Sequence, residues 1–210
     1  LKDILPTNTV LIGRDARISS PEIHQALCDG IINSGLNVID TGLSTTPMIY
    51  WLTASLKLDA SVQITASHNP PEYNGMKISG THAIPIAYDN GLSKLEEIIL
   101  SKNVTKSFKK GKIIKADYKE KYFNFLNNKN SSVHSTGFII DNSNGMSGLF
   151  SRQLFPGHKQ INAEVDGTFP AHMPNPLEEA NRKQLHEAVI KEKAQGGIIF
   201  DGDADRVMFL

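Results

Sequence analysis

Three carboxylates at alternate positions form the strongest chemical signal in this sequence. Asp201, Asp203 and Asp205 stand in the run Asp-Gly-Asp-Ala-Asp-Arg, between two short apolar segments. In an extended or looped backbone, side chains at alternate positions project to one side, so their charges repel one another unless a cation lies among them. Carboxylate oxygens as the only ligands favour Mg²⁺, with Mn²⁺ or Ca²⁺ as substitutes. An acidic surface loop is the alternative, but the apolar flanks favour a metal site.

A serine hydroxyl lies in a second polar loop, residues 65–70, which reads Thr-Ala-Ser-His-Asn-Pro. Residues 61–64 form a strand pattern, so Ser67 is expected just past a strand's carboxyl end, where open α/β sheets bind ligands. A plain turn is the alternative, because these residue types are common in turns. Phosphorylated, Ser67 would carry roughly 1.5 to 2 negative charges, which Mg²⁺ and Arg206 could neutralise. A Ser-His-Asp hydrolase is disfavoured because the sequence has no Gly-x-Ser-x-Gly motif.

Composition excludes several classes of protein. The chain has 210 residues, 40% of them hydrophobic, which suffices for one or two domains with apolar cores. Basic and acidic residues number 22 each, so no net charge draws the chain to nucleic acid or to an anionic membrane. The single cysteine, Cys28, cannot form an intrachain disulfide, and because it falls in an apolar helical pattern we expect a small core residue rather than a nucleophile. No signal-type or membrane-length apolar run is present. We therefore expect a cytoplasmic protein without nucleic-acid or membrane partners.

The elements that must position these loops alternate between strand and helix, as in α/β domains. Ser20, followed by proline and glutamate, predicts a helix N-cap, and Gly35 a C-cap. Asn74-Gly75 is a hairpin-turn signal. The patterns of the first half predict strands at 9–12, 37–39, 61–64 and within 78–86. They predict helices at 20–34, 46–56 and 118–126, and a short helix that ends with residues 96–100. The lysines between 106 and 115 could suggest a nucleic-acid patch, but they lack aromatic interleaving of the type that binds nucleic acid, so we expect a solvated connection there.

The second half repeats this alternation. Its patterns predict strands at 138–140, 160–165, 197–200 and 207–210, a short helix ending at 154 and a long helix at 177–194. The polar segment 127–135 is the expected domain boundary. The fold class is therefore α/β, with two consecutive α/β domains that have mixed sheets flanked by helices, at 1–130 and 131–210. Because Leu1 is not a methionine and the chain ends in an apolar run, we expect part of a longer protein whose second domain lacks its last strand.

Four motifs together resemble the α-D-phosphohexomutases, most closely the bacterial phosphomannomutase/phosphoglucomutase branch. In chain order they are residues 65–70, Tyr-Asn-Gly-Met-Lys at 73–77, Val-Asp-Gly-Thr-Phe-Pro-Ala-His-Met-Pro-Asn-Pro at 165–176, and residues 201–206. The resemblance implies a phosphoserine enzyme that interconverts hexose 1-phosphates and 6-phosphates. It also implies hexose phosphates and a hexose 1,6-bisphosphate intermediate as its ligands. Phosphoryl transfer of this kind depends on positioning and on charge neutralisation.

The resemblance also assigns roles to individual residues. It implies Ser67 as phosphoryl carrier, Asp201, Asp203 and Asp205 as Mg²⁺ ligands with the phosphate of Ser67 completing the site, Lys77 as general acid/base, and His68 and Arg206 as residues that line the transfer site. Taken alone, Lys77 would be an ordinary solvent lysine.

Three further segments have weaker matches. Residues 13–17, Gly-Arg-Asp-Ala-Arg, resemble the family's first loop, in which arginines face the cleft, and a surface Arg–Asp ion pair is the alternative. Residues 141–145 resemble a structural turn of the second domain. We interpret His172 as a residue that supports its loop rather than as a ligand.

Family members have four domains, and this chain matches the first two. The sugar-recognition loop of the third domain and the phosphate-binding loop of the fourth are absent from the match, so we expect these 210 residues to bind Mg²⁺ and to turn over hexose phosphates barely or not at all. Two alternatives stay open. One is a haloacid-dehalogenase-type phosphatase, with Asp201 as nucleophile and Asp203 as acid/base. The other is a non-catalytic fragment that binds metal or phosphosugar.

Overall fold

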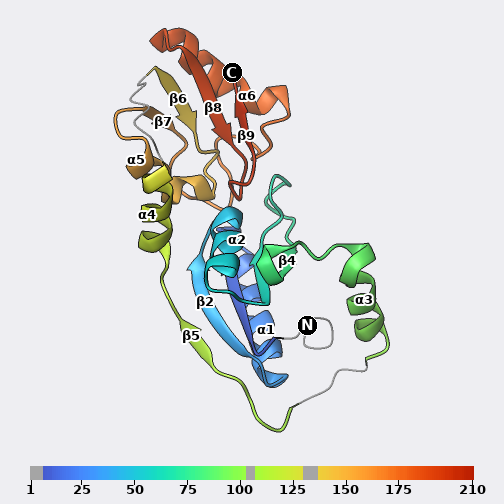
Figure 1. The fold of residues 1–210 in the computed structure, drawn as a ribbon. Helices are drawn as coiled ribbons and strands as arrows, with labels where there is room; N and C mark the ends of the chain where they lie inside the picture. Colours follow the sequence, from blue (N-terminus) through green and yellow to red (C-terminus); the bar gives the residue numbers. More distant parts are fainter. Residues whose placement is uncertain (1–6, 103–106, 130–136) are drawn as a thin grey trace.

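The computed structural model describes residues 7–102, 107–129 and 137–210, and these form two α/β units that meet end to end (Figure 1). The first unit and the segment that leaves it contain these elements: β1 (Thr9–Arg14), α1 (Ser20–Asn33), β2 (Asn37–Leu43), α2 (Thr46–Ser55), β3 (Ala60–Ile64), β4 (Met76–Gly80), the short turns η1 (Thr81–Ala83) and η2 (Tyr88–Leu92), α3 (Ser93–Leu100), β5 (Ile113–Lys115) and α4 (Lys119–Lys129). The expected α/β class with mixed sheets is confirmed.

The second unit contains the remaining elements. They are β6 (Phe138–Asp141), the turn η3 (Met146–Leu149), α5 (Ser151–Leu154), β7 (Lys159–Ile161), α6 (Glu179–Glu192), β8 (Gly196–Phe200) and β9 (Val207–Phe209). The boundary expected at 130/131 falls at residues 130–136, which lie outside the described part of the chain. In the described residues, no helix has both the length and the apolar character needed to cross a membrane.

Each sheet is mainly parallel with one antiparallel edge strand. The first has the order β4-β3-β1-β2-β5 and the second β7-β6-β8-β9, with β4 and β9 antiparallel to their neighbours. The carboxyl ends of β3 and β8 meet between the two units, since Ser67, just past β3, is hydrogen-bonded to Asp201, just past β8. The fold thus brings two distant loops to one place.

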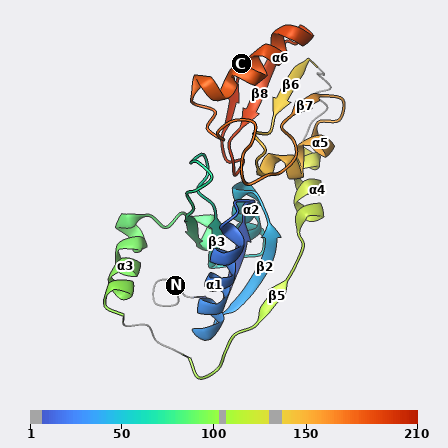
Figure 2. The same cartoon turned by 180° about the vertical axis from the view of Figure 1, so that it is seen from behind.

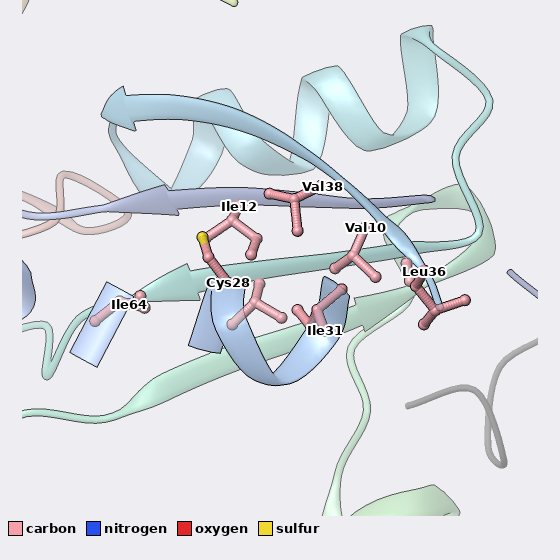
Figure 3. Packing of buried hydrophobic residues seen from close by; sticks show 9 residues of the cluster. Val10, Ile12, Cys28, Ile31, Leu36, Val38 and Ile64 are labelled. Carbon is pink, nitrogen blue, oxygen red and sulfur yellow. The ribbon is translucent and has the colours of Figure 1, made fainter. Parts of the chain in front are cut away.

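Helices cover both faces of the first sheet because its central strand is apolar on both sides. Val10 and Ile12 pack under α1 with Cys28 and Ile31, as Figure 3 shows, so the expectation of a buried core Cys28 is confirmed. Leu11 points to the opposite face and packs with α2. That second cluster continues into α4 and α5, which places α4 where the two units meet (Figures 1 and 2).

Some predicted elements were wrong in their details. Residues 162–165 are not a strand, because Asn162 takes a φ of +52° and its side chain binds Asp141 and Gln184 instead. The N-cap of α1 is Ser19 rather than Ser20, whose hydroxyl donates to Asp15. The lysine-rich segment contains β5, an exposed edge strand that pairs with β2.

The Asn74-Gly75 signal did not give a two-residue turn. β3 and β4 do pair as an antiparallel hairpin, but residues 65–75 form its whole connection, and neither Asn74 nor Gly75 has a positive φ. The long connection leaves room for the Ser67 loop between the paired strands.

Candidate active site

Ser67 lies at the carboxyl end of β3 with its hydroxyl between an anion and a cation. Its Oγ donates a hydrogen bond to Oδ2 of Asp201 at 2.8 Å and accepts one from Nη2 of Arg206 at 2.6 Å. Its backbone N–H donates to the Thr65 hydroxyl at 2.9 Å, and its φ is +53°, in the left-handed region. The side chain is therefore held by the second unit, while the local turn holds its backbone.

The acidic loop folds around Asp201. Oδ1 of Asp201 accepts the backbone N–H groups of Asp205 and Arg206, both at 3.1 Å, and its Oδ2 also accepts from Nε of Arg206 at 3.1 Å. Ala204, between the second and third carboxylates, takes a φ of +62°, which turns the chain back on itself. The tight turn brings the carboxylates together.

The three carboxylates of Asp201, Asp203 and Asp205 fit a divalent cation. One oxygen from each lies within 4.8 Å of the others, and Asp201 and Asp203 are fully buried. Oδ1 of Asp203 is buried and has no hydrogen-bond partner among the described residues. Burying an unpaired carboxylate oxygen is costly, and an all-oxygen set suits a hard cation such as Mg²⁺. The donor set therefore fits a metal, without fixing which one.

The carboxylates differ in their electrostatic setting. Burial raises the pKa of Asp201 to about 7, and the negative charge of Asp203 acts in the same direction. Burial also acts to raise the pKa of Asp203, but the charge and hydrogen bond of Lys77, together with hydrogen bonds from Thr46 and Ser67, outweigh it, so this pKa lies below its ordinary value. The site therefore favours the ionised form of Asp203. It disfavours the ionised form of Asp201 unless a cation compensates the negative charge.

Lys77 reaches this cluster from the edge strand β4. It pairs with Gln63 of β3, and its Nζ lies 2.6 Å from Oδ2 of Asp203 and 2.5 Å from Oδ2 of Asp205. Burial acts to lower the pKa of Lys77, yet the charges and hydrogen bonds of both carboxylates raise it overall. Lys77 is thus held as an ammonium beside the carboxylates.

His68 faces the same arginine as Ser67. Its Nδ1 contacts Nη2 of Arg206, and because a guanidinium only donates, this nitrogen must accept. Burial lowers the pKa of His68, and the Arg206 charge lowers it further. The imidazole is therefore neutral in this arrangement.

Five of these side chains line one open cleft of about 520 Å³: Ser67, His68, Lys77, Asp205 and Arg206. Its walls come from the Ser67 loop, from residues 74–77 and from the end of the acidic loop, including Lys77, Asp205 and Arg206. The structure therefore brings together the residues singled out from the sequence: Ser67, His68, Lys77, Asp201, Asp203, Asp205 and Arg206.

Thr46, at the start of α2, is a site residue that sequence reasoning missed. Its Oγ1 donates to Oδ2 of Asp203 at 2.5 Å, and its backbone N–H donates to the Asp203 carbonyl at 3.1 Å. The N-cap of α2 is the preceding residue, Thr45, whose side chain accepts from the Met48 N–H. The sequence signal that could have identified it is the pair Thr45-Thr46 before Pro47. Only one of the two threonines can cap the helix, so the hydroxyl of the other is available for another partner.

The first loop differs from both expectations for it. Arg17 neither faces the cleft nor lies on the surface: its side chain is 0% exposed and forms an ion pair at 3.1 Å with Asp15, which is also buried. Arg14 is partly exposed, and its side chain donates to the Asp15 carbonyl at 3.2 Å. The expected Arg–Asp ion pair is therefore present, but it is buried rather than on the surface, because the loop folds inward under residues 67–73 and the guanidinium finds further partners there.

His172 and the 141–145 turn support each other, which fits the scaffolding interpretation. Nε2 of His172 lies 3.1 Å from Oδ2 of Asp141, and Nδ1 lies 2.9 Å from the Met173 carbonyl. Both partners are acceptors, so this geometry suits the doubly protonated ring. Burial acts to lower the pKa of His172, but the Asp141 and Met173 hydrogen bonds raise it overall.

Comparisons with known proteins agree on one family. Residues 2–105 match the model described as "Phosphoglucomutase/phosphomannomutase, alpha/beta/alpha domain I", and residues 118–210 match the corresponding domain II. A phosphomannomutase of Escherichia coli is 33% identical over 97% of this chain and 48% of its own length. A phosphoglucomutase of Neisseria meningitidis serogroup B is 32% identical over 94% of this chain and 44% of its own length.

A solved structure gives the same result in three dimensions. The crystal structure of a phosphoglucomutase/phosphomannomutase family protein from Burkholderia thailandensis superposes with a TM-score of 0.87 at 28% identity, over 97% of this chain and 46% of that one. The chain spans about half the length of the curated relatives it matches.

Proposed function

Because this chain belongs to the phosphoglucomutase/phosphomannomutase family, we propose that it provides the phosphoryl-transfer centre of a phosphohexomutase. In this proposal Ser67 carries a phosphoryl group between the 1- and 6-positions of a hexose phosphate, by way of a hexose 1,6-bisphosphate. The main observation that supports this proposal is that the Ser67 hydroxyl is hydrogen-bonded to both Asp201 and Arg206, at the edge of a three-carboxylate cluster.

The contacts of Ser67 suggest how the transfer proceeds. When a bisphosphate loads the enzyme, a sugar O–P bond breaks and an Oγ–P bond forms. The hydroxyl hydrogen leaves toward Oδ2 of Asp201, which already accepts it at 2.8 Å. The sugar oxygen takes a proton, and the family resemblance assigns its donor as Lys77, whose ammonium lies on the cleft wall. Transfer back to the other sugar hydroxyl reverses these steps.

Charge neutralisation is the main contribution of the protein, since phosphoryl transfer needs little covalent chemistry. The Arg206 guanidinium donates to the oxygen that receives the phosphoryl group. Asp201, Asp203 and Asp205 would hold Mg²⁺, and the phosphate on Ser67 would complete its ligands. When bound, Mg²⁺ would neutralise charge on the phosphoryl oxygens. His68 and Arg206 would line the transfer site.

The phosphatase alternative has no support. Asp201 is fully buried and does not line the cleft, whereas Ser67 does, and both halves of the chain match phosphoglucomutase/phosphomannomutase domains. The non-catalytic alternative is decided by experiment.

The test is to load the protein with glucose 1,6-bisphosphate and Mg²⁺ and to map the phosphosite by intact-mass and peptide mass spectrometry. We expect one phosphoryl group on Ser67, none on the Ser67→Ala variant and normal loading of Ser101→Ala, which changes a serine of the α3 C-terminus. A phosphoryl group on Asp201, or none on the folded wild type, would overturn the proposal.

A further inference from the structure

Arg17 is a buried cation that the proposed chemistry does not use. Its side chain is 0% exposed, and it lies in the loop that follows β1 rather than in the cleft wall. Burial lowers its pKa, and the charge of Asp15 opposes that effect. A guanidinium stays charged in proteins, so its burial requires a compensating set of partners.

Those partners are backbone carbonyls of residues 67–73, in the connection between β3 and β4 that contains Ser67. Nη2 donates to the carbonyls of Ser67 at 2.8 Å and Asn69 at 2.7 Å. Nη1 donates to the carbonyls of Pro70 at 2.5 Å and Tyr73 at 3.1 Å. With Nε bound to Asp15 at 3.1 Å, every guanidinium N–H has an acceptor.

The guanidinium is itself fixed in place. Asp15 is 2% exposed, and its Oδ1 accepts the Arg17 backbone N–H at 3.1 Å and the Ser20 hydroxyl at 2.5 Å. The other oxygen faces Nε of Arg17. The planar fork therefore has one orientation, and it presents four donors to one loop.

The loop needs such support because its backbone is strained at the reacting residue. Ser67 has a φ of +53°, a conformation unfavourable for residues with a Cβ, and strained conformations persist only when their surroundings determine them. The Arg17 bond to the carbonyl of Ser67 itself fixes the peptide that follows the hydroxyl-bearing residue. Lysine could not replace this contact, because its ammonium has three donors and no planar fork.

The second unit reaches the same guanidinium. The Phe169 ring lies with its centroid 5.0 Å from Cζ of Arg17, and Phe169 is 4% exposed. A Cβ at Gly167 would stand 1.9 Å from the Ala16 carbonyl oxygen, so only glycine allows this close approach. Arg17 thus lies between the Ser67 loop and a loop of the second unit.

We propose that Arg17 is a positioning residue for Ser67, which holds the hydroxyl in line for phosphoryl transfer through four loop carbonyls and which is fixed by Asp15 and Phe169. This inference rests on the proposed function for its kinetic consequence, but not for its structural one. Because Arg17 does not line the cleft, its loss should impair transfer rather than substrate binding.

The test uses the complete gene product with Arg17→Lys. We expect phosphoryl loading of Ser67 from glucose 1,6-bisphosphate to slow by about 10- to 100-fold, with KM changed by no more than about twofold. Amide hydrogen exchange in residues 65–75 should rise by at least about tenfold. The matched control is Arg182→Lys. Arg182 lies in the first turn of α6 and also donates to two backbone carbonyls, those of Pro176 and Leu177. It should leave loading and loop exchange unchanged.

The outcomes separate the two proposals. If the wild type takes up no phosphoryl group, the proposed function fails, and hydrogen exchange still decides the role of Arg17. A folded Arg17→Lys variant with unchanged loop exchange, or with unchanged loading of an active wild type, overturns the inference. If Arg17→Lys does not fold, Phe169→Leu replaces it. That variant removes the ring that fixes the guanidinium, so loop exchange should rise by about threefold, and no rise overturns the inference.

Discussion

Asp203 shows how one side chain joins the two units. It belongs to the acidic loop of the second unit, yet its Oδ2 accepts from Thr46 at 2.5 Å and from Lys77 at 2.6 Å, both of the first unit. Its other oxygen remains for a cation. A candidate metal ligand of one unit is therefore oriented by donors from the other.

Thr46 should accordingly matter for stability. We expect Thr46→Val, which keeps the shape and removes the hydroxyl, to lower the free energy of unfolding by about 1.5 to 3 kcal/mol, because a buried carboxylate loses a donor. Urea unfolding measures this, and Thr46→Ser, which keeps the hydroxyl, should stay within about 1 kcal/mol of wild type. A Val variant as stable as wild type would show that the hydrogen bond contributes nothing.

At the scale of elements, the long loop between β7 and α6, residues 162–178, links the first unit to the acidic loop. Phe169 packs on Arg17, and a Cβ at Gly202 would stand 3.3 Å from Pro174, so this loop contacts both the first unit and the acidic loop. His172 ties the same loop to Asp141 at the end of β6. The loop is therefore anchored at its middle by one ion pair, whose histidine side chain is 8% exposed.

This anchor should make stability depend on pH. The folded-state pKa of His172 is raised, so its stabilisation is complete below the ordinary histidine pKa of about 6.5 and is lost as pH rises through the folded-state pKa. We expect His172→Gln to lower the free energy of unfolding by about 1 to 3 kcal/mol at pH near 6 and by less at higher pH. Urea unfolding between about pH 5.5 and pH 9 checks this.

The control for that measurement is His186→Gln, which changes an exposed histidine on α6. It should give a small difference from wild type that does not vary with pH. A His172→Gln difference that is constant across the range, or that grows as pH rises, would contradict the assigned ion pair.

At the scale of the whole molecule, the described residues form the proposed phosphoryl-transfer centre around an open cleft. The cleft is lined by residues suited to phosphate and metal, and the chain spans about half the length of its curated relatives. Binding energy from remote parts of a substrate contributes to turnover as well as to affinity. A centre without contacts to the remote parts of the substrate should therefore still bind the cation and the phosphoryl group, but should interconvert hexose phosphates slowly.

We expect these 210 residues to bind Mn²⁺ or Mg²⁺ and to convert glucose 1-phosphate at least about 100-fold more slowly than a phosphomannomutase relative assayed beside them. A coupled assay for glucose 6-phosphate measures the rate, and calorimetry measures metal binding. Asp203→Asn serves as the control that should weaken metal binding. Turnover equal to that of the relative would contradict this prediction.

The sequence by itself determined the elements and the chemical character of the two loops. Strands and helices follow from local periodicity and capping, which act over a few residues, and these gave α1, α2, β3, β8 and the α/β class closely. Alternate carboxylates after one buried strand and a serine after another indicate a cation and a phosphoryl group from residue type and spacing alone.

The tertiary structure alone decided which groups meet. Arg17 and Thr46 look like an ordinary loop arginine and a helix-start threonine, because their partners lie far away in the chain. β5 was missed because its three exposed residues become a strand only by pairing with β2. Such contacts depend on how elements that are far apart in the chain pack together. Local sequence does not encode the partner of a polar side chain that burial has removed from water.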